Sequence, residues 1–178
     1  SLAHLMAASV QKLWPSARFG VGPTIENGFY YDVEIPGYNL TEADLAKIEK
    51  RMREKLKKKY DFKRQEISID EAIGLFQKIN QPYKVELLTE LKTKGTTKLN
   101  EGEMEVMPEG LSKISVYWTG DFIDLCRGPH VNNVADLSKV AFKLERLSGA
   151  YWRGNEKNKM LTRIYGVAFS SKHELNDH

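Results

Sequence analysis

The residue types most suited to chemistry lie close together in one short segment, Cys126-Arg127-Gly128-Pro129-His130. The Gly-Pro pair ends a strand, so a turn can bring the Cys126 thiol and the His130 imidazole toward one point. Both side chains are common metal ligands. Packing is the competing interpretation, because cysteine is often simply buried and a histidine beside a turn is often a hydrogen-bonded structural residue. The segment therefore marks a candidate site without fixing its chemistry.

A carboxylate precedes this segment on the same expected strand. Alternate residues of a strand share one face, so Asp124 should stand beside Cys126. Burying a carboxylate is costly unless it is hydrogen-bonded or paired, and Arg127 is the nearest candidate partner. Asp124 is therefore expected either to complete the site or to anchor Arg127 or a backbone turn.

Two further titratable residues come from distant parts of the chain. His4 lies on a predicted helix among Ala3, Ala7 and Ala8, whose small side chains leave room above the imidazole, although a hydrogen-bonded structural histidine fits the same place. Lys84 opens a mostly apolar segment that predicts a strand, and partial desolvation there would lower the pKa of its amine toward proton transfer. A lysine whose amine reaches solvent is equally consistent with the sequence.

Apolar residues at helical spacing predict three helices that would position these groups. They are 2–14, which Pro15 ends; a helix that Thr41 caps, with Leu45, Ile48, Met52 and Leu56 on one face; and a shorter one from Ser68, where Ser68 and Glu71 form a capping box.

Strand signals complete the expected fold. Asn27-Gly28 between apolar flanks predicts a β-hairpin with a type I′ turn. Segments rich in β-branched and aromatic residues predict strands at 85–88, 114–118, 122–126, 140–147 and 160–169. We therefore expect an α+β fold, a mixed or antiparallel β-sheet with helices packed on it.

Length and composition bound the kind of protein. The chain has 178 residues, 41% of them hydrophobic, which suits one domain with its own core. Its single cysteine excludes an internal disulfide framework and favours a reducing compartment, so we expect a cytoplasmic protein. No apolar run approaches the ~18 residues of a membrane span, so no membrane partner is expected.

We expect residues 1–178 to be a single domain from a longer polypeptide. A capping box at 171–174 predicts that a helix begins there, and residues 171–178 are expected to be the start of a truncated connecting helix. Residues 92–113 contain few core residues and are expected to form a surface insertion. Gly20-Val21-Gly22 matches only the first half of a dinucleotide fingerprint, so a nucleotide-driven activity is not supported.

The strongest charge pattern is a basic run at 47–64, with ten basic and three acidic residues. A solvated outer helix face is the common fate of such a run. The alternative is a nucleic-acid footprint, in which the cations release counterions from backbone phosphates. Charge alone leaves both interpretations open.

Nearly the whole sequence resembles one known family, the editing domain of bacterial-type threonyl-tRNA synthetases, which is their second N-terminal domain. Four segments carry the resemblance: SLAHLMAASVQKLWP, GVGPTIENGFYYDV, DFIDLCRGPHV and GAYWRGNEKNKMLTRIYGVAF. The resemblance implies the threonyl/alanyl-tRNA synthetase editing-domain fold. It also implies hydrolysis of serine wrongly esterified to the 3′-terminal adenosine of threonine tRNA, with threonine excluded sterically. A second site is needed because a missing methyl gives only ~1–3 kcal/mol of discrimination.

The same resemblance implies roles for individual residues. The implied catalytic set is His4, Lys84, Asp124, Cys126 and His130. Lys84 would transfer a proton for the attacking water, Cys126 and His130 would position water and substrate, and Asp124 would hold the seryl amino group or the local hydrogen-bond network. The implied substrate-binding residues are Tyr31 and Arg127, and the implied tRNA contacts are Lys50, Arg53, Lys57 and Lys58.

The resemblance implies a reaction without a cofactor, and as partners the serine-carrying acceptor end of threonine tRNA and the remainder of the synthetase. Two alternatives stay open: a zinc site of His4, Cys126 and His130, as in alanyl-type relatives, and a tRNA acceptor-end binding module without catalysis. The second arises because only His4 fills the family's first-helix motif His-x-x-x-His, whose first histidine would directly precede Ser1. Weak or no activity is therefore expected of the chain as given.

Overall fold

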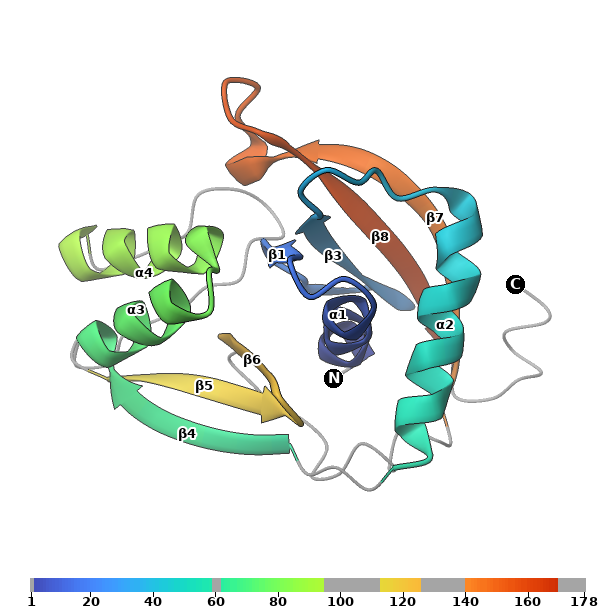
Figure 1. Cartoon of the computed structure of the whole chain (residues 1–178), viewed down its shortest axis with the longest axis horizontal. Coiled ribbons are helices and arrows are strands. Elements are labelled where there is room, and N and C mark those ends of the chain that lie inside the picture. The colour runs from blue at the N-terminus through green and yellow to red at the C-terminus, as the bar shows by residue number, and fades with distance from the viewer. Residues whose placement is uncertain (1, 59–61, 95–112, 126–139, 170–178) are drawn as a thin grey trace.

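The protein is described by a computed structural model that covers residues 2–58, 62–94, 113–125 and 140–169. Within these residues the chain forms four α-helices and eight strands, and the strands make two antiparallel sheets. One helix, α1, lies between the two sheets (Figure 1). The predicted α+β class with antiparallel sheets is confirmed.

The first sheet has the strand order β1-β3-β8-β7, with β2 paired to β3. Its strands are β1 (Arg18–Phe19), β2 (Thr24–Ile25), β3 (Gly28–Glu34), β7 (Ala141–Tyr151) and β8 (Met160–Phe169). Two helices pack on it, α1 (Leu2–Leu13) against β3 and α2 (Glu42–Leu56) against β7. A short 3₁₀ helix, η2 (Trp152–Gly154), follows β7.

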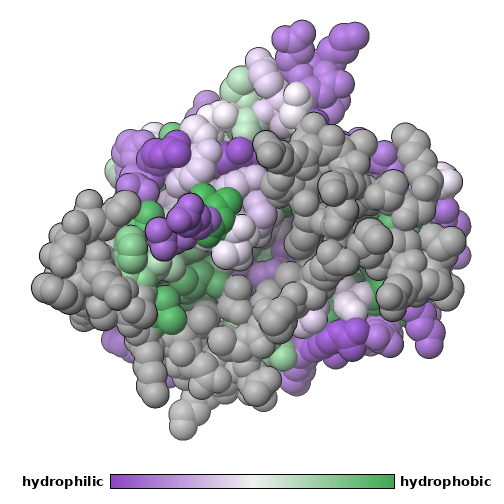
Figure 2. All heavy atoms as spheres, turned by 180° about the vertical axis from the view of Figure 1, so that it is seen from behind, coloured by the Kyte–Doolittle hydropathy of each residue, from purple (hydrophilic) through white to green (hydrophobic). Residues whose placement is uncertain are grey.

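The second sheet has the order β4-β5-β6 and is covered by two helices (Figure 1). Its strands are β4 (Phe62–Ser68), β5 (Lys113–Thr119) and β6 (Phe122–Leu125), and its helices are α3 (Ile69–Lys78) and α4 (Pro82–Lys94). Each sheet has its own main hydrophobic cluster. In the view of Figure 2, hydrophilic side chains dominate the periphery of the described surface and hydrophobic ones gather nearer its middle.

Helix α1 is enclosed on all sides along most of its length. Every residue from Leu2 to Val10 is buried, as expected for a helix that contacts both sheets. The one hydroxyl in this stretch is satisfied inside the helix, where Ser9 Oγ donates to the Leu5 carbonyl at 2.8 Å. The helix predicted over 2–14 is therefore confirmed, and both of its sides face protein.

Strand β6 faces both clusters, as its alternation predicts. Phe122 packs in the cluster of the first sheet, whereas Ile123 and Leu125 pack in the cluster of the second sheet. Asp124 is completely buried and shares the face of Phe122 toward α1. The predicted strand at 122–126 is confirmed as far as Leu125.

The strand predicted at 85–88 is wrong, because these residues belong to α4. Pro82 is the first residue of the helix. A proline is tolerated there because the N–H that it lacks would have no partner within the helix. Leu87, Leu88 and Leu91 then recur at helical spacing and are buried. A short segment with three apolar residues among four does not separate a helix from a buried strand, and the following Glu, Leu and Lys residues are good helix formers.

Strand β4 was not predicted. Most of its residues are exposed, and it is the outer strand of its sheet, paired with β5 alone. Charged side chains protect such edges from pairing with other chains. The first residues of β4 belong to the basic run at 47–64. Because its residues are largely charged, β4 lacks the alternation of apolar and polar residues that is typical of a half-buried strand.

The predicted hairpin is confirmed, but its turn lies one residue earlier. Ile25 pairs with Gly28, so Glu26 and Asn27 form the turn, and of these two only Asn27 has a positive φ, 57°. A type I′ turn needs positive φ at both positions, so that turn type is wrong. Glycine at position 28 serves close approach instead, because a Cβ there would overlap the Gly166 carbonyl oxygen of β8.

The remaining predicted elements agree with the structure. The second and third predicted helices correspond to α2 and α3. Ser68 caps α3 as predicted by accepting from the Glu71 N–H, but the return bond of a capping box is replaced by one from the Ser68 hydroxyl to the Glu71 carboxylate. The strands predicted at 114–118, 140–147 and 160–169 correspond to β5, β7 and β8. Of the insertion predicted at 92–113, its first three residues continue α4, residue 113 begins β5, and 95–112 lie outside the described residues, as do 171–178.

Candidate active site

Four buried polar side chains from four elements meet where the two sheets approach α1. They are His4 of α1, Tyr31 of β3, Lys84 of α4 and Asp124 of β6, and we call them the polar tetrad. The most exposed of the four, His4, has only 4% of its surface accessible. The chain thus gathers residues from its first, middle and later parts in one place.

Asp124 is the centre of the tetrad. Its Oδ1 lies 2.6 Å from Lys84 Nζ and accepts a 2.7 Å hydrogen bond from the Leu125 N–H. Its Oδ2 accepts a short hydrogen bond from the Tyr31 hydroxyl and lies 3.3 Å from His4 Nδ1. Lys84 Nζ also donates to the Tyr31 hydroxyl at 2.9 Å. The carboxylate therefore links the imidazole, the phenol and the amine into one network.

Burial makes this network both rigid and sensitive to change. Lys84 and Asp124 are 1% and 0% exposed, so their opposite charges compensate each other in a medium of low dielectric. Removing one partner of such a pair typically costs about 3–5 kcal/mol, since the other charge stays buried without compensation. The groups are consequently held in place before any substrate arrives.

The turn that begins α4 is tied to the first sheet at two points. Gln81 accepts from the Phe19 N–H at 2.9 Å and donates to the Ala17 carbonyl at 3.0 Å. Tyr83 donates to Glu34 Oε1 of β3 at 2.9 Å. Burial and the adjacent Glu34 carboxylate raise the pKa of Tyr83, so its hydroxyl stays a donor. These bonds fix the helix turn from which the tetrad lysine projects.

A third tie joins α4 to η2. Trp152 Nε1 donates to Glu86 Oε2 at 2.6 Å, and the Trp152 ring lies 4.8 Å from that of Tyr83, centroid to centroid. Arg153 pairs with Glu90 and lies 3.6 Å from Glu86 Oε1. Arg153 has a positive φ of 58°, which turns the chain sharply enough for both side chains to reach α4.

Tyr31 is positioned by close packing with a glycine. A Cβ at Gly22 would overlap the Tyr31 ring, so only glycine lets the preceding loop pass at this distance. The ring also packs edge-on against Phe19, with centroids 5.7 Å apart. The Gly20-Val21-Gly22 segment therefore serves the packing of the site.

Known proteins similar to this chain point the same way. The family described as "Threonyl and Alanyl tRNA synthetase second additional domain" matches residues 114–165, which include Asp124. A threonine–tRNA ligase of Aquifex aeolicus is 44% identical over 99% of this chain, and one of a Sulfurihydrogenibium species is 46% identical over 100% of it. The predicted resemblance to the threonyl-tRNA synthetase editing domain is confirmed. The chain spans about a quarter of the length of these ligases.

Three of the site residues predicted for this chain lie outside the described residues, namely Cys126, Arg127 and His130. Their places in the site stay predictions. Asp124, expected to pair with Arg127, has Lys84 as a described partner. Lys84 itself lies in the first turn of a helix rather than at the start of a strand, so its burial comes from the packing of α4 between both sheets.

The alternative zinc set has one ligand within the described residues. His4 meets Asp124 through Nδ1 at 3.3 Å. This is an ion-pair distance rather than a hydrogen bond that would orient the ring toward a metal. The imidazole is a donor type that zinc takes, while Cys126 and His130 stay predictions.

The four predicted tRNA contacts lie on α2 or directly after it. Lys50, Lys57 and Lys58 are exposed. Arg53 is engaged within the protein, because it pairs with Glu49 at 3.1 Å, donates to the Phe142 carbonyl at 3.3 Å and stacks on the Phe142 ring. Arg53 therefore holds α2 against β7 although its side chain is still 51% exposed, so all four predicted contacts reach solvent.

Sequence reasoning missed the residues that hold α4 in place, namely Gln81, Glu86 and Trp152. One signal was present, since Trp152 and Arg153 belong to a segment that carries the family resemblance. Trp152 and Glu86 are hydrogen-bonded to each other although they lie 66 residues apart in the sequence. No local sequence pattern reveals such a pairing. None of the three side chains belongs to the tetrad, and all of them position it.

Proposed function

We propose that this chain hydrolyses the ester that joins serine, attached in error, to the 3′-terminal adenosine of threonine tRNA. One structural observation supports the proposal above others, namely the buried tetrad of His4, Tyr31, Lys84 and Asp124. The relatives are named threonine–tRNA ligases, which supports an editing role on tRNA. On this proposal the domain works in the cytoplasm, as part of a longer synthetase.

In the proposed reaction, water attacks the ester carbonyl and the ribose hydroxyl leaves. Lys84 serves as the proton-transfer partner and, as an ammonium ion, stabilises the developing oxyanion. Asp124 orients Lys84 and His4 through its two oxygens and offers a carboxylate for the seryl amino group. His4, whose Nδ1 lies 3.3 Å from this carboxylate, acts on water through Nε2. Cys126 is not a covalent nucleophile here, because positioned water suffices for an oxygen ester.

Discrimination against threonine is proposed to arise from the packing around Tyr31. The loop at Gly22 leaves no room for even one additional carbon beside the Tyr31 ring. A wall fixed this closely cannot move to admit an extra methyl without overpacking, which costs about 1–3 kcal/mol. The smaller seryl group is therefore accepted and the threonyl group is rejected.

The decisive experiment compares threonine tRNA carrying serine with the same tRNA carrying threonine. We expect serine to be released preferentially, and equal release of the two amino acids would contradict the steric proposal. A second chain with histidine added before Ser1 tests the expectation of weak activity, because that residue should raise the rate. Binding of tRNA without hydrolysis by both chains would favour the binding-module alternative.

We propose that the reaction needs no cofactor, and zinc is the competing candidate. When bound, zinc would supply an activated water. The buried His4 imidazole is the observation in its favour. Metal analysis of the purified chain distinguishes the two proposals: stoichiometric zinc, lost together with activity on chelation and regained on addition, would replace the metal-free reaction. Activity that is unchanged by chelation would remove the zinc candidate.

A further inference from the structure

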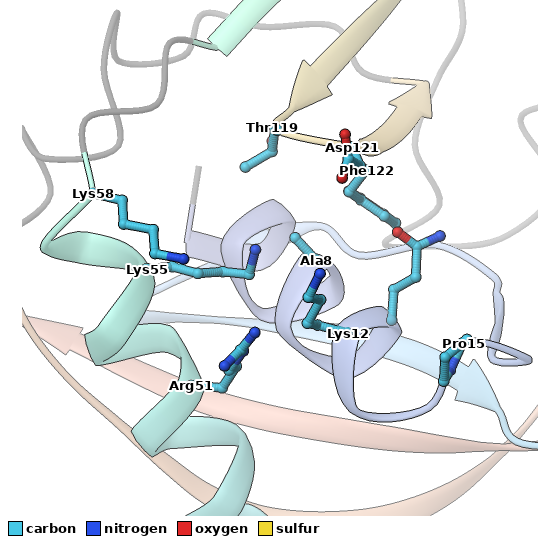
Figure 3. Close-up of a pocket in the computed structure, with 11 residues that line it drawn as sticks. Ala8, Lys12, Pro15, Arg51, Lys55, Lys58, Thr119, Asp121 and Phe122 are labelled. Atoms are coloured by element: carbon cyan, nitrogen blue, oxygen red, sulfur yellow. The ribbon is translucent and has the colours of Figure 1, made fainter.

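A hollow lies at the opposite end of α1 from the tetrad's histidine. It has a volume of about 380 Å³ and is lined by α1, α2 and the turn between β5 and β6. Four of its lining side chains are basic, namely Lys12 of α1, Arg51 and Lys55 of α2, and Lys58 just after α2. We call this the basic pocket. Figure 3 shows these side chains converging from the two helices, with Asp121 on the opposite wall.

Like charges dominate the basic pocket. Asp121 is the one acidic residue among its lining residues, all of which the structure describes. Arg51 pairs with Glu54 at 3.1 Å, yet its buried Nε has no hydrogen-bond partner among the described residues. Burial and the charges of Arg51, Lys12 and Lys58 lower the pKa of Lys55. Such a gathering of cations is relieved when an anion enters it.

The pocket and the tetrad lie along the same two elements. On α1, His4 and Ala8 are one turn apart and Lys12 follows one turn later, so all three share a helix face. His4 and Lys12 are about 12 Å apart along the helix axis. On β6, Phe122 lines the pocket and Asp124 belongs to the tetrad, two residues apart on one strand face. A chain of three to four stacked nucleotides, at ~3.4 Å each, covers this distance.

We infer that the basic pocket binds a backbone phosphate of the tRNA acceptor strand whose terminal ester lies at the tetrad. The inference rests on the proposed function and adds Lys12, Arg51 and Lys55 to the implied tRNA contacts, of which the pocket itself contains Lys58. Lys12, Lys55 and Lys58 supply the positive charge, and Arg51 supplies a planar donor suited to phosphate oxygens. The phosphate contact fixes the register of the strand, so that the ester reaches the tetrad without sliding.

The test neutralises the pocket and follows two substrates. The variant Lys12→Gln/Lys55→Gln is compared with the charge-matched control Lys78→Gln/Lys143→Gln, whose exposed lysines lie on α3 and β7. We expect a several-fold higher KM for seryl-tRNA, an unchanged kcat, and a salt dependence of binding whose slope is smaller by about 1. The 3′-seryl ester of adenosine carries no backbone phosphate, so its hydrolysis should be unchanged. The control should match the unmodified chain on both substrates.

Each alternative outcome has a distinct meaning. If the unmodified chain hydrolyses both substrates and the pocket variant is unchanged on tRNA, the phosphate inference is overturned and the proposed function stands. The inference also fails if Lys50→Gln/Lys57→Gln, on the outer face of α2, raises KM as much as the pocket variant. Hydrolysis of neither substrate, both by the unmodified chain and by the chain with histidine added before Ser1, would instead overturn the proposed function. Asp121→Asn, which removes the one pocket anion, should tighten tRNA binding.

Discussion

The tetrad and the basic pocket are two charged regions on the same face of α1, and they differ in how their charges are balanced. At the tetrad, opposite charges are paired and almost completely buried. At the pocket, like charges converge beside solvent with one acidic residue among them. The charges of the tetrad compensate one another without a ligand, whereas the repulsion among the pocket cations falls when an anion binds.

This contrast separates two tasks that an RNA-ester hydrolase must combine. Chemistry needs groups whose positions do not change, and a buried network provides them at the expense of tolerance to mutation. Binding a long polyanion needs charges that act at a distance and respond to salt. The two regions should therefore differ in how they respond to substitution, to salt and to pH.

The largest effect is expected from breaking the buried ion pair. Lys84→Met should lower the free energy of unfolding by about 3–5 kcal/mol, because it leaves the Asp124 carboxylate buried without its cation. Urea unfolding measures the loss. The double variant Lys84→Met/Asp124→Leu should recover most of this stability, since no unpaired charge remains, yet it should release no serine. A single variant as stable as the unmodified chain would contradict the paired arrangement.

A smaller loss is expected when the tie between α4 and η2 is cut. Trp152→Phe removes the donor to the Glu86 carboxylate while keeping an aromatic ring, and hydrogen bonds to charged groups are worth about 1.5–3 kcal/mol. Because Glu86 is on the helix that carries Lys84, kcat for serine release should fall more than KM rises. Tyr151→Phe, at the exposed neighbouring position, is the control and should change neither value. A rise in KM alone would show that Trp152 does not position the tetrad.

Adding one carbon beside Tyr31 should give an effect of similar or smaller size. Gly22→Ala forces the Tyr31 ring or the loop to move, which should cost about 1–3 kcal/mol of stability and weaken discrimination against threonine. Thermal unfolding and the serine-to-threonine release ratio measure the two consequences. Gly74→Ala is the matched control, because its added Cβ meets nothing within 4 Å inside α3 and should stabilise by about 0.5–1 kcal/mol.

The stability of the beginning of α2, the helix that supplies Arg51 and Lys55 to the pocket, should depend on pH. Asp44 accepts from the Thr41 N–H at 2.9 Å and from the Tyr38 hydroxyl at 2.8 Å. Burial by itself would raise the pKa of Asp44. The hydrogen bonds and the charge of Lys47 outweigh this effect and hold the pKa below its ordinary value of 3.8. The stabilisation is therefore complete above pH 3.8 and is lost as the pH falls through the lower, folded-state pKa.

Asp44→Asn should accordingly cost about 1 kcal/mol near pH 7. The difference between this variant and the unmodified chain should shrink when urea unfolding is repeated in acid. A difference that stays constant or grows in acid would show that Asp44 does not act through its ionised form. Glu42→Gln, in the same first turn and exposed, is the control for a loss of charge alone.

Salt should give the smallest and most selective effect. Raising the ionic strength from 50 to 200 mM should lower the rate on subsaturating seryl-tRNA about threefold for one phosphate contact. The rate on the 3′-seryl ester of adenosine should stay constant, because the tetrad is buried and screening does not reach it. Equal salt effects on both substrates would remove the contrast between the two regions.

Sequence reasoning recovered those elements that have a clear period or cap. Helices α1 and α3 were predicted from apolar spacing together with Pro15 and the Ser68–Glu71 pair. It failed at α4 and β4 for opposite reasons. In α4 a short apolar run matched a strand, and in β4 charges covered an exposed edge. Both errors arise where tertiary packing, rather than local pattern, decides the element.

The same limit applies to the site. The family resemblance pointed to His4, Tyr31, Lys84 and Asp124, and the structure shows them in contact. The residues by themselves gave each one a structural alternative, because a lone buried histidine or lysine has no signature in sequence. The basic run contained Arg51, Lys55 and Lys58, but it could not indicate Lys12, which reaches them only through the packing of α1 against α2.

The enclosure of α1 has a consequence for the newly made protein. Within this domain α1 is synthesised before every strand that covers it, and β8 follows more than 140 residues later. At 5–20 residues per second, its apolar surface waits many seconds for those neighbours. Among the elements of this domain α1 is therefore the most exposed to aggregation during synthesis, and a chaperone that shields α1 would raise the yield of folded domain more than one that acts on later elements.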